Sequence, residues 1–150
     1  MLPFDSYPDK GRKLFGLPRG SNCRQEYGLR FMQITGEKHC AYCHVDFTKF
    51  ETWLTMVLDH VIRVSAWKSM GVPDEWGGDY ANTVLACGTC NGFCNRYMPG
   101  SDIVRPVTLE EFFDRRDEIF EKRKQLISAR RESERQFFEK KKWEIRSSGD

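Results

Sequence analysis

Apolar positions form short runs over the first two thirds of this 150-residue chain and a regular stripe over the last third. Residues 29–34 and 52–58 form short β-like stretches, and the second is apolar and β-branched enough to predict a buried strand. Turn-forming residues fill 67–80, so one regular element is excluded there. A short helix is expected from Cys90, and the Pro-Gly pair at 99–100 would end it.

The stripe of the last third begins at a capping box. Thr108 and Glu111 have the spacing at which a hydroxyl and a carboxylate satisfy each other's first-turn amides. Apolar residues then recur at many steps of three, four or seven up to Ile145, which is typical of one helix face. A continuous helix over 108–146 would be about 58 Å long, which is more than a domain of this size covers. We therefore expect either a break near 128–135 or packing on another chain.

Composition divides the chain into three parts. Residues 1–28 are expected to form an irregular basic arm, 29–107 a folded domain, and 108–150 a charged amphipathic helix. The net charge of +2 does not by itself indicate a nucleic-acid partner. That total is an average, because residues 1–50 carry eight basic and five acidic side chains whereas 51–107 carry four and six.

The sequence predicts a cytoplasmic protein with no membrane partner. No run approaches eighteen apolar residues, and the N-terminus has no apolar signal core. In a reducing compartment, paired cysteines indicate metal ligands before disulfides.

Two CxxC pairs supply four candidate ligands for a structural zinc: Cys40, Cys43, Cys87 and Cys90. A redox pair, a disulfide or iron are the alternatives, and neither pair has the setting of a thioredoxin-like motif. The 43 residues between the pairs exceed the spacing of a compact zinc ribbon, so the zinc would hold together the two ends of a long intervening segment, 44–86. Four further side chains are interpreted as bystanders: His39, His44, Cys23 and Cys94.

This segment and the residue after the second pair carry polar side chains in an ordered pattern. Asp59 and His60 end the second apolar run, Asn82 lies five residues before Cys87, and Asn91 follows Cys90 directly. The segments CAYC, VLDHVI and NTVLACGTCN together resemble the zinc-binding branch of the HNH endonucleases, over residues 38–98. The resemblance implies an α+β fold with a ββα-metal (His-Me finger) core tied by a four-cysteine zinc site.

The resemblance also assigns roles to these residues. His60 matches the general base, Asp59 a ligand of the catalytic metal, and Asn82 the residue that holds the loop of the base. Asn91 matches the last motif position, where an asparagine is similar to members that use a hard cation such as Mg²⁺ or Mn²⁺. The chemistry agrees, because a neutral histidine is a suitable base near neutral pH and carboxylate and amide oxygens suit Mg²⁺.

A nuclease of this kind must hold a polyanion, and we expect duplex DNA. Basic residues near the motif and in the arm are the candidate phosphate contacts: Arg63, Arg96, Arg19, Arg24 and Arg30. Trp67, Trp76 and Tyr80 could stack on bases, but packing inside the domain is the favoured interpretation. The 108–146 helix mixes charges of both signs, which favours a homodimer contact or a partner protein over DNA.

Two other functions remain open at this level. A non-catalytic, zinc-stabilised nucleic-acid-binding module explains the cysteines and the basic arm but not Asp59 and His60. An assembly protein that recruits a partner through its long helix explains only 108–150. The target sequence, and nicking as against double-strand cleavage, do not follow from the residues.

Overall fold

The computed structural model describes residues 23–100 and 104–147. Arg19 and the rest of 1–22, which make up most of the expected basic arm, lie outside the described residues. The elements, in chain order, are the π-helix η2 (Cys23–Gly28), α1 (Leu29–Thr35), α2 (Phe50–Trp53), β1 (Met56–His60), α3 (Val64–Met70), α4 (Asp74–Gly77), the 3₁₀ helix η3 (Tyr80–Asn82), β2 (Thr83–Cys87), α5 (Gly88–Cys94) and α6 (Leu109–Ser147).

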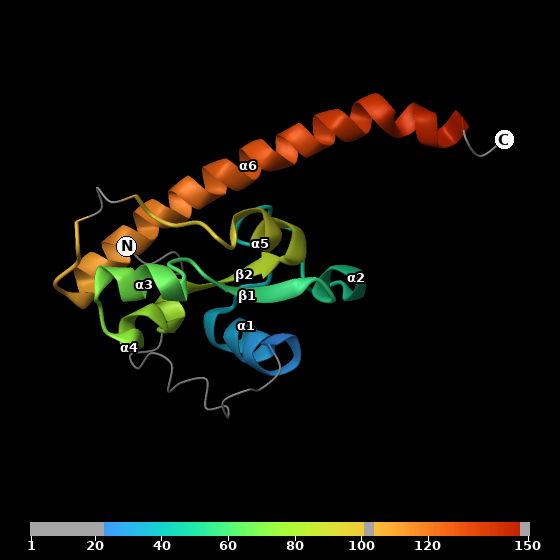
Figure 1. The fold of residues 1–150 in the computed structure, drawn as a ribbon. Helices are drawn as coiled ribbons and strands as arrows, with labels where there is room; N and C mark the ends of the chain where they lie inside the picture. Colours follow the sequence, from blue (N-terminus) through green and yellow to red (C-terminus); the bar gives the residue numbers. More distant parts are fainter. Residues whose placement is uncertain (1–22, 101–103, 148–150) are drawn as a thin grey trace.

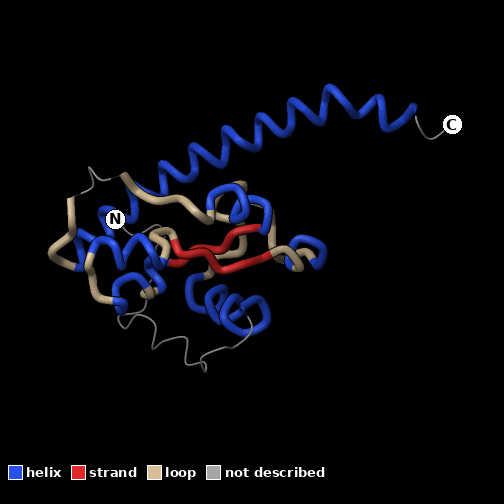
Figure 2. The backbone as a smooth tube through the Cα atoms, in the orientation of Figure 1, coloured by secondary structure: helices blue, strands red, loops and turns tan. Residues whose placement is uncertain are grey.

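A two-stranded antiparallel sheet stands at the centre of the molecule (Figure 2). Met56 of β1 pairs with Cys87 of β2, and His60 pairs with Thr83, so the strands are in register over their whole length. Helix α1 lies on one side of the hairpin, whereas α5 and then α6 lie on the other (Figure 1). All five residues of β2 are buried, as this layering requires.

One predicted strand is a helix. Leu29–Thr35 is helical, and Gly36 ends the helix in a left-handed conformation with φ of 75°. The apolar positions Tyr27, Phe31 and Ile34 are spaced by four and three, so they reach the core from one helix face. Residues 29–34 are too short an apolar stretch to reveal this period in the sequence.

The second predicted strand is only partly correct. Met56–His60 forms β1, but Thr52 and Trp53 belong to the short helix α2. The turn-rich stretch 67–80 forms parts of several short helices, and the helix expected from Cys90 is α5, Gly88–Cys94.

The capping box of α6 is confirmed. The amide of Glu111 donates to the hydroxyl of Thr108, at 3.1 Å, and the amide of Thr108 donates to the carboxylate of Glu111, at 3.3 Å. The helix then runs without a break from Leu109 to Ser147. Its first half is part of the same buried cluster as the sheet, through Phe112, Ile119 and Ile127.

The second half of α6 extends beyond the folded domain (Figure 1). Residues 128–145 are all exposed, including Phe137, Phe138, Trp143 and Ile145. Ion pairs three or four residues apart join Arg130 to Glu134, Arg135 to Glu132, Lys141 to Glu144 and Lys142 to Glu139. Each such pair contributes about 0.2–0.5 kcal/mol to an isolated helix, which favours continuity where the stripe turns polar.

The predicted class is confirmed at the level of an α+β fold with a long C-terminal helix and four clustered cysteines. Among the helices that the structure describes, none is long and apolar enough to cross a membrane.

Candidate functional site

The four cysteines of the two CxxC pairs come together at one end of the hairpin. Their sulfur atoms all lie within 4.8 Å of one another, and Cys43 Sγ is 3.8 Å from Cys87 Sγ. Four sulfurs at about 2.3 Å from a tetrahedral zinc would be about 3.8 Å apart, so the cluster could hold such an ion. Among the described residues, this is the only cluster of three or more Cys, His, Asp or Glu side chains that is close enough to hold a metal.

Backbone amides hold the cysteines in place. The amide of Cys87 donates to Cys40 Sγ at 3.3 Å, and the amide of Cys90 donates to Cys87 Sγ at 3.4 Å. Cys87 caps α5 in this way, so the sheet and the helix meet at the cluster.

Crowding of the thiols makes a bound cation favourable. The hydrogen bond with Cys87, together with burial, raises the pKa of Cys40 to about 12. Burial, with the nearby charge of Cys40, raises the pKa of Cys90 to about 12, whereas the Cys40 hydrogen bond lowers the pKa of Cys87. A divalent cation would compensate the thiolate charges that the cluster alone disfavours.

The neighbouring sulfur and imidazole groups do not join this cluster. Cys94 is buried at the end of α5 and is outside the group of four. His39 and His44 are exposed beside the first pair and are likewise outside it. Cys23 begins η2, and its side chain lies outside the described part of the chain.

Asp59 is nearly buried between β1 and α6, with 8% of its surface exposed. Its Oδ2 atom accepts a hydrogen bond from the hydroxyl of Tyr42, at 3.0 Å, and forms an ion pair with Arg123, at 2.8 Å. Burial raises the pKa of Asp59, and the Arg123 charge opposes that rise. Burial also raises the pKa of Tyr42 well above its ordinary value, so the hydroxyl remains a donor.

His60 ends β1 and is half-buried. Its ring forms a T-shaped contact with Trp67, with 5.3 Å between ring centroids. The indole of Trp67 donates to Asp74 at 2.9 Å and lies so close to Gly77 that a Cβ there would be 2.0 Å from the ring. Glycine at position 77 is therefore required for the wall against which His60 packs.

Asn82 is fully buried and satisfies three main-chain groups with its side chain. Its Oδ1 accepts from the amide of Ile62 at 2.9 Å, and its Nδ2 donates to the carbonyl of Ile62 at 2.9 Å and to that of Gly77 at 2.6 Å. Its own carbonyl accepts from the amide of Val61 at 2.9 Å. One residue thus ties the loop after His60 to the last residue of α4, which packs against Trp67.

Replacing Asn82 with leucine is expected to destabilise the domain strongly. The amide and carbonyl of Ile62 and the carbonyl of Gly77 would lose their buried partner, at about 1–3 kcal/mol for each group left unsatisfied. Urea denaturation followed by circular dichroism measures the loss. As a control, Asn95→Leu changes the exposed C-cap of α5 and should shift the midpoint far less. Equal midpoints for the two variants would contradict the anchoring role.

Asn91 lies on α5, one residue after the last cysteine of the cluster, and its side chain is half-buried. Helix α5 packs against both strands of the hairpin. The structure therefore places the predicted hard-cation ligands on neighbouring elements, β1 and α5.

Asp59 and Asn91 carry oxygen donors, the ligand type that hard cations prefer. Oδ2 of Asp59 is held by Tyr42 and Arg123, and among the hydrogen bonds of the described residues none is made to Oδ1. Carboxylates that bind metals are themselves hydrogen-bonded through their other oxygen. Oδ1 of Asp59 and the amide oxygen of Asn91 are the atoms to which the predicted hard-cation site refers.

The predicted phosphate contacts differ in what surrounds them. Arg30 and Arg96 are exposed, and Arg63 is half-buried just before α3. Arg24 donates to the carbonyl of Leu54 at 2.9 Å and lies over the ring of Trp53, so a phosphate would compete with these contacts. The aromatic residues favoured as packing are indeed inside: Trp67 and Tyr80 are buried, and Trp76 contacts Phe112.

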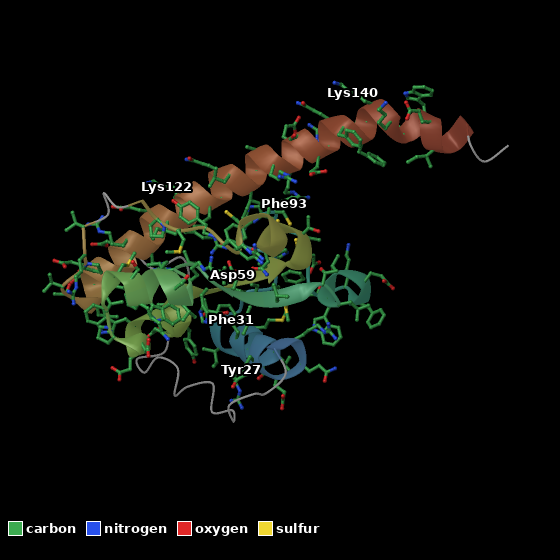
Figure 3. The ribbon with its side chains drawn as sticks, viewed as in Figure 1. Tyr27, Phe31, Asp59, Phe93, Lys122 and Lys140 are labelled. Carbon is green, nitrogen blue, oxygen red and sulfur yellow. The ribbon has the colours of Figure 1, made fainter. Side chains whose placement is uncertain are left out.

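Sequence reasoning missed three residues that reach the site from outside the motif positions. Tyr42 stands out in the sequence only as part of CAYC, and Arg123 and Arg131 only as charges of the tail helix. Arg131 approaches Cys90 Sγ at 3.9 Å, and Arg130 lies over the ring of Phe93, which Figure 3 shows between α5 and α6. The sequence did hold one sign of this contact: Arg123 lies on the apolar face of the predicted helix, where a buried charge needs a partner.

Comparison with known proteins gives no assignment. No family model matches this chain, and neither a curated protein nor a solved structure matches it significantly.

Proposed function

We propose that this protein is a metal-dependent endonuclease of the HNH type, which hydrolyses phosphodiester bonds of DNA. The proposal rests on the residue pattern of Asp59, His60, Asn82 and Asn91 and on their placement around one hairpin and one helix.

One observation supports the proposal above the others. Asn82 binds both main-chain groups of Ile62, the second residue after His60, and also the carbonyl of Gly77 at the end of α4. That is the loop-holding role which the resemblance implies for this position, whereas the sequence alone defines only its spacing. A general base needs such a fixed orientation, because catalysis depends on its distance from the proton that it takes.

In the proposed reaction, His60 accepts a proton from the water that attacks the phosphorus. Trp67 packs against the imidazole in a T-shaped contact that would limit its reorientation, and His60 keeps part of its surface exposed. When bound at Asp59 and Asn91, Mg²⁺ or Mn²⁺ supplies stabilisation of the charge that develops on the phosphate. As the new P–O bond forms, the P–O3′ bond breaks and the leaving oxygen takes a proton from solvent, so the products are a 5′-phosphate and a 3′-hydroxyl.

Incubation of the zinc-loaded protein with supercoiled plasmid tests the proposal. Mg²⁺, Mn²⁺, Ca²⁺ and buffer with EDTA form the series, and nicked or linear plasmid is expected with the first two. Intact plasmid under all four conditions would contradict the proposal.

The second candidate function is a zinc-stabilised nucleic-acid-binding module without catalysis. Burial of Asp59 in an ion pair with Arg123 favours it, because such a pair also serves a purely structural purpose. A shift of labelled duplex DNA in a gel, without nicking in any of the ions above, would identify this function instead.

We also propose that the distal half of α6 joins two copies of the chain. Phe138 and Ile145 lie eleven and eighteen residues beyond Ile127, close to its helical face, so the stripe that is buried on the domain continues past it. Changing both Phe138 and Ile145 to glutamate should therefore convert a dimer into a monomer in light scattering coupled to size exclusion. Lys140, on the outer side of the helix in Figure 3, provides the control Lys140→Glu.

A monomeric wild-type protein at high concentration would contradict the proposed dimer. Point variants are preferable to removal of 108–150, since Phe112, Ile119 and Ile127 belong to the core.

A further inference from the structure

Arg123 is a buried arginine on the face of α6 that meets the sheet. Only 2% of its surface is exposed. Its Nη2 atom is 2.8 Å from Oδ2 of Asp59, and its Nη1 atom donates to the carbonyls of His60, at 2.9 Å, and Val61, at 3.0 Å. The guanidinium also lies over the ring of Tyr42, 5.4 Å from its centroid.

These contacts reach the same short segment that Asn82 holds from the other side. Asn82 binds the amides of Val61 and Ile62 and the carbonyl of Ile62, whereas Arg123 binds the carbonyls of His60 and Val61. Together the two residues bind the main-chain amides and carbonyls of residues 60–62, which restricts movement of this loop. Figure 3 shows Asp59 in the layer between β1 and α6, where this second set of contacts is made.

We propose that Arg123 is a positioning residue of the candidate nuclease site, orienting the Asp59 carboxylate and the His60–Val61 main chain with one guanidinium. This inference rests on the proposed function and deepens it. Helix α6, outside the motif, thereby belongs to the site.

The geometry of the guanidinium suits this task. Its planar fork presents donors in fixed directions, so one group can bind a carboxylate on one side and two carbonyls on the other. A lysine ammonium is a point charge on a flexible stem and would reach fewer of these acceptors at once. Because Arg123 engages Oδ2, it turns Oδ1 of Asp59 away from itself, and this is the atom assigned to the hard cation.

Helix α6 is seated firmly enough to act as a support. Ile119 and Ile127, one turn before and after Arg123, are both buried in the core. Further along, Arg130 lies over Phe93 and Arg131 approaches Cys90 Sγ, so the helix also contacts α5 beside the cysteine cluster. Contacts at Ile119, Arg123, Ile127 and Arg131 hold four successive turns of α6, so this part of the helix can act as a fixed wall of the site.

Cleavage kinetics of Arg123 variants test the inference. Arg123→Met keeps much of the side-chain volume and removes every donor. We expect kcat on a duplex to fall about 10–100-fold, the usual cost of losing a group that orients a metal ligand. KM for DNA should change little, because Arg123 is buried and does not face the substrate. Arg123→Lys should recover part of the loss, and Tyr42→Phe should show a smaller one.

Two measurements separate positioning from general damage. Mn²⁺ binding followed by electron paramagnetic resonance should weaken in Arg123→Met while zinc content stays at one per chain. Arg116 is equally buried two turns earlier, contacts Phe113 and Asp117 of the same helix, and provides the matched control Arg116→Met. We expect that control to lower the melting temperature without lowering kcat.

Clear outcomes would overturn the inference. Wild-type or faster cleavage by folded, zinc-loaded Arg123→Met would show that the arginine is a structural brace or a restraint. If that variant does not fold, Arg123→Lys decides the question, and an unchanged kcat and Mn²⁺ affinity would overturn the inference. A wild-type protein that cuts no DNA would instead overturn the proposed function, and the positioning role with it.

Discussion

Replacing His60 with alanine is expected to reduce plasmid cleavage about 10²–10⁴-fold, the range that a positioned general base contributes. His60 is the last residue of β1, is partly exposed, and is the only histidine in the two strands. Its removal should leave zinc content unchanged, because His60 is outside the group of four cysteines that would hold that ion. The rate of conversion of supercoiled to nicked plasmid in Mg²⁺ measures the effect.

The other two histidines provide the control. His39 and His44 are exposed beside the first CxxC pair and outside the cysteine cluster, so His39→Ala should cleave at the wild-type rate. Equal rates for His60→Ala and His39→Ala would refute the assignment of the base. A thermal melt of both variants separates loss of catalysis from loss of the Trp67 contact.

The spacing of residues in the sequence was enough to predict the cysteine cluster and to single out Asn82. Two CxxC pairs predict a shared metal because a tetrahedral ion needs four ligands, and the four sulfurs do meet. The loop-holding role of Asn82 followed from its resemblance to one motif position, and the three hydrogen bonds of its side chain are consistent with it. The assignments of a base and of a hard-cation site remain predictions.

Contacts between distant segments were not predictable in the same way. Arg123 lies 64 residues after Asp59 in the chain, and within a tail of nearly balanced charge it resembles any solvated arginine. Only docking of α6 on α5 and β1 reveals its contacts. The strand predicted at 29–34 is wrong because apolar composition satisfies both periods over so short a stretch, and packing of Phe31 against Tyr80 decides between them.

Removal of zinc is expected to unfold the domain. Structural zinc binding is worth about 10–16 kcal/mol in small zinc-binding peptides, whereas domains of this kind are stable by about 5–15 kcal/mol in total. Cys87 and Cys90 join β2 to α5, and Cys40 brings the first CxxC pair to that junction. Loss of the ion would therefore leave β2, α5 and the first CxxC pair without a common anchor. Cys90→Ser, or a strong chelator, should therefore abolish the cooperative thermal transition seen by circular dichroism.

The matched control for that loss is Cys94→Ser. Cys94 lies one turn further along α5, is similarly buried, and is outside the group of four, so the same chemical change should leave one zinc per chain and a cooperative transition. If Cys90→Ser melted like Cys94→Ser and also retained its zinc, the ion would be held elsewhere. Should Cys90→Ser instead lose zinc and yet keep a cooperative transition, packing of α5 against α6 and the two strands would be sufficient to hold it, with Arg130 over the ring of Phe93 as one such contact.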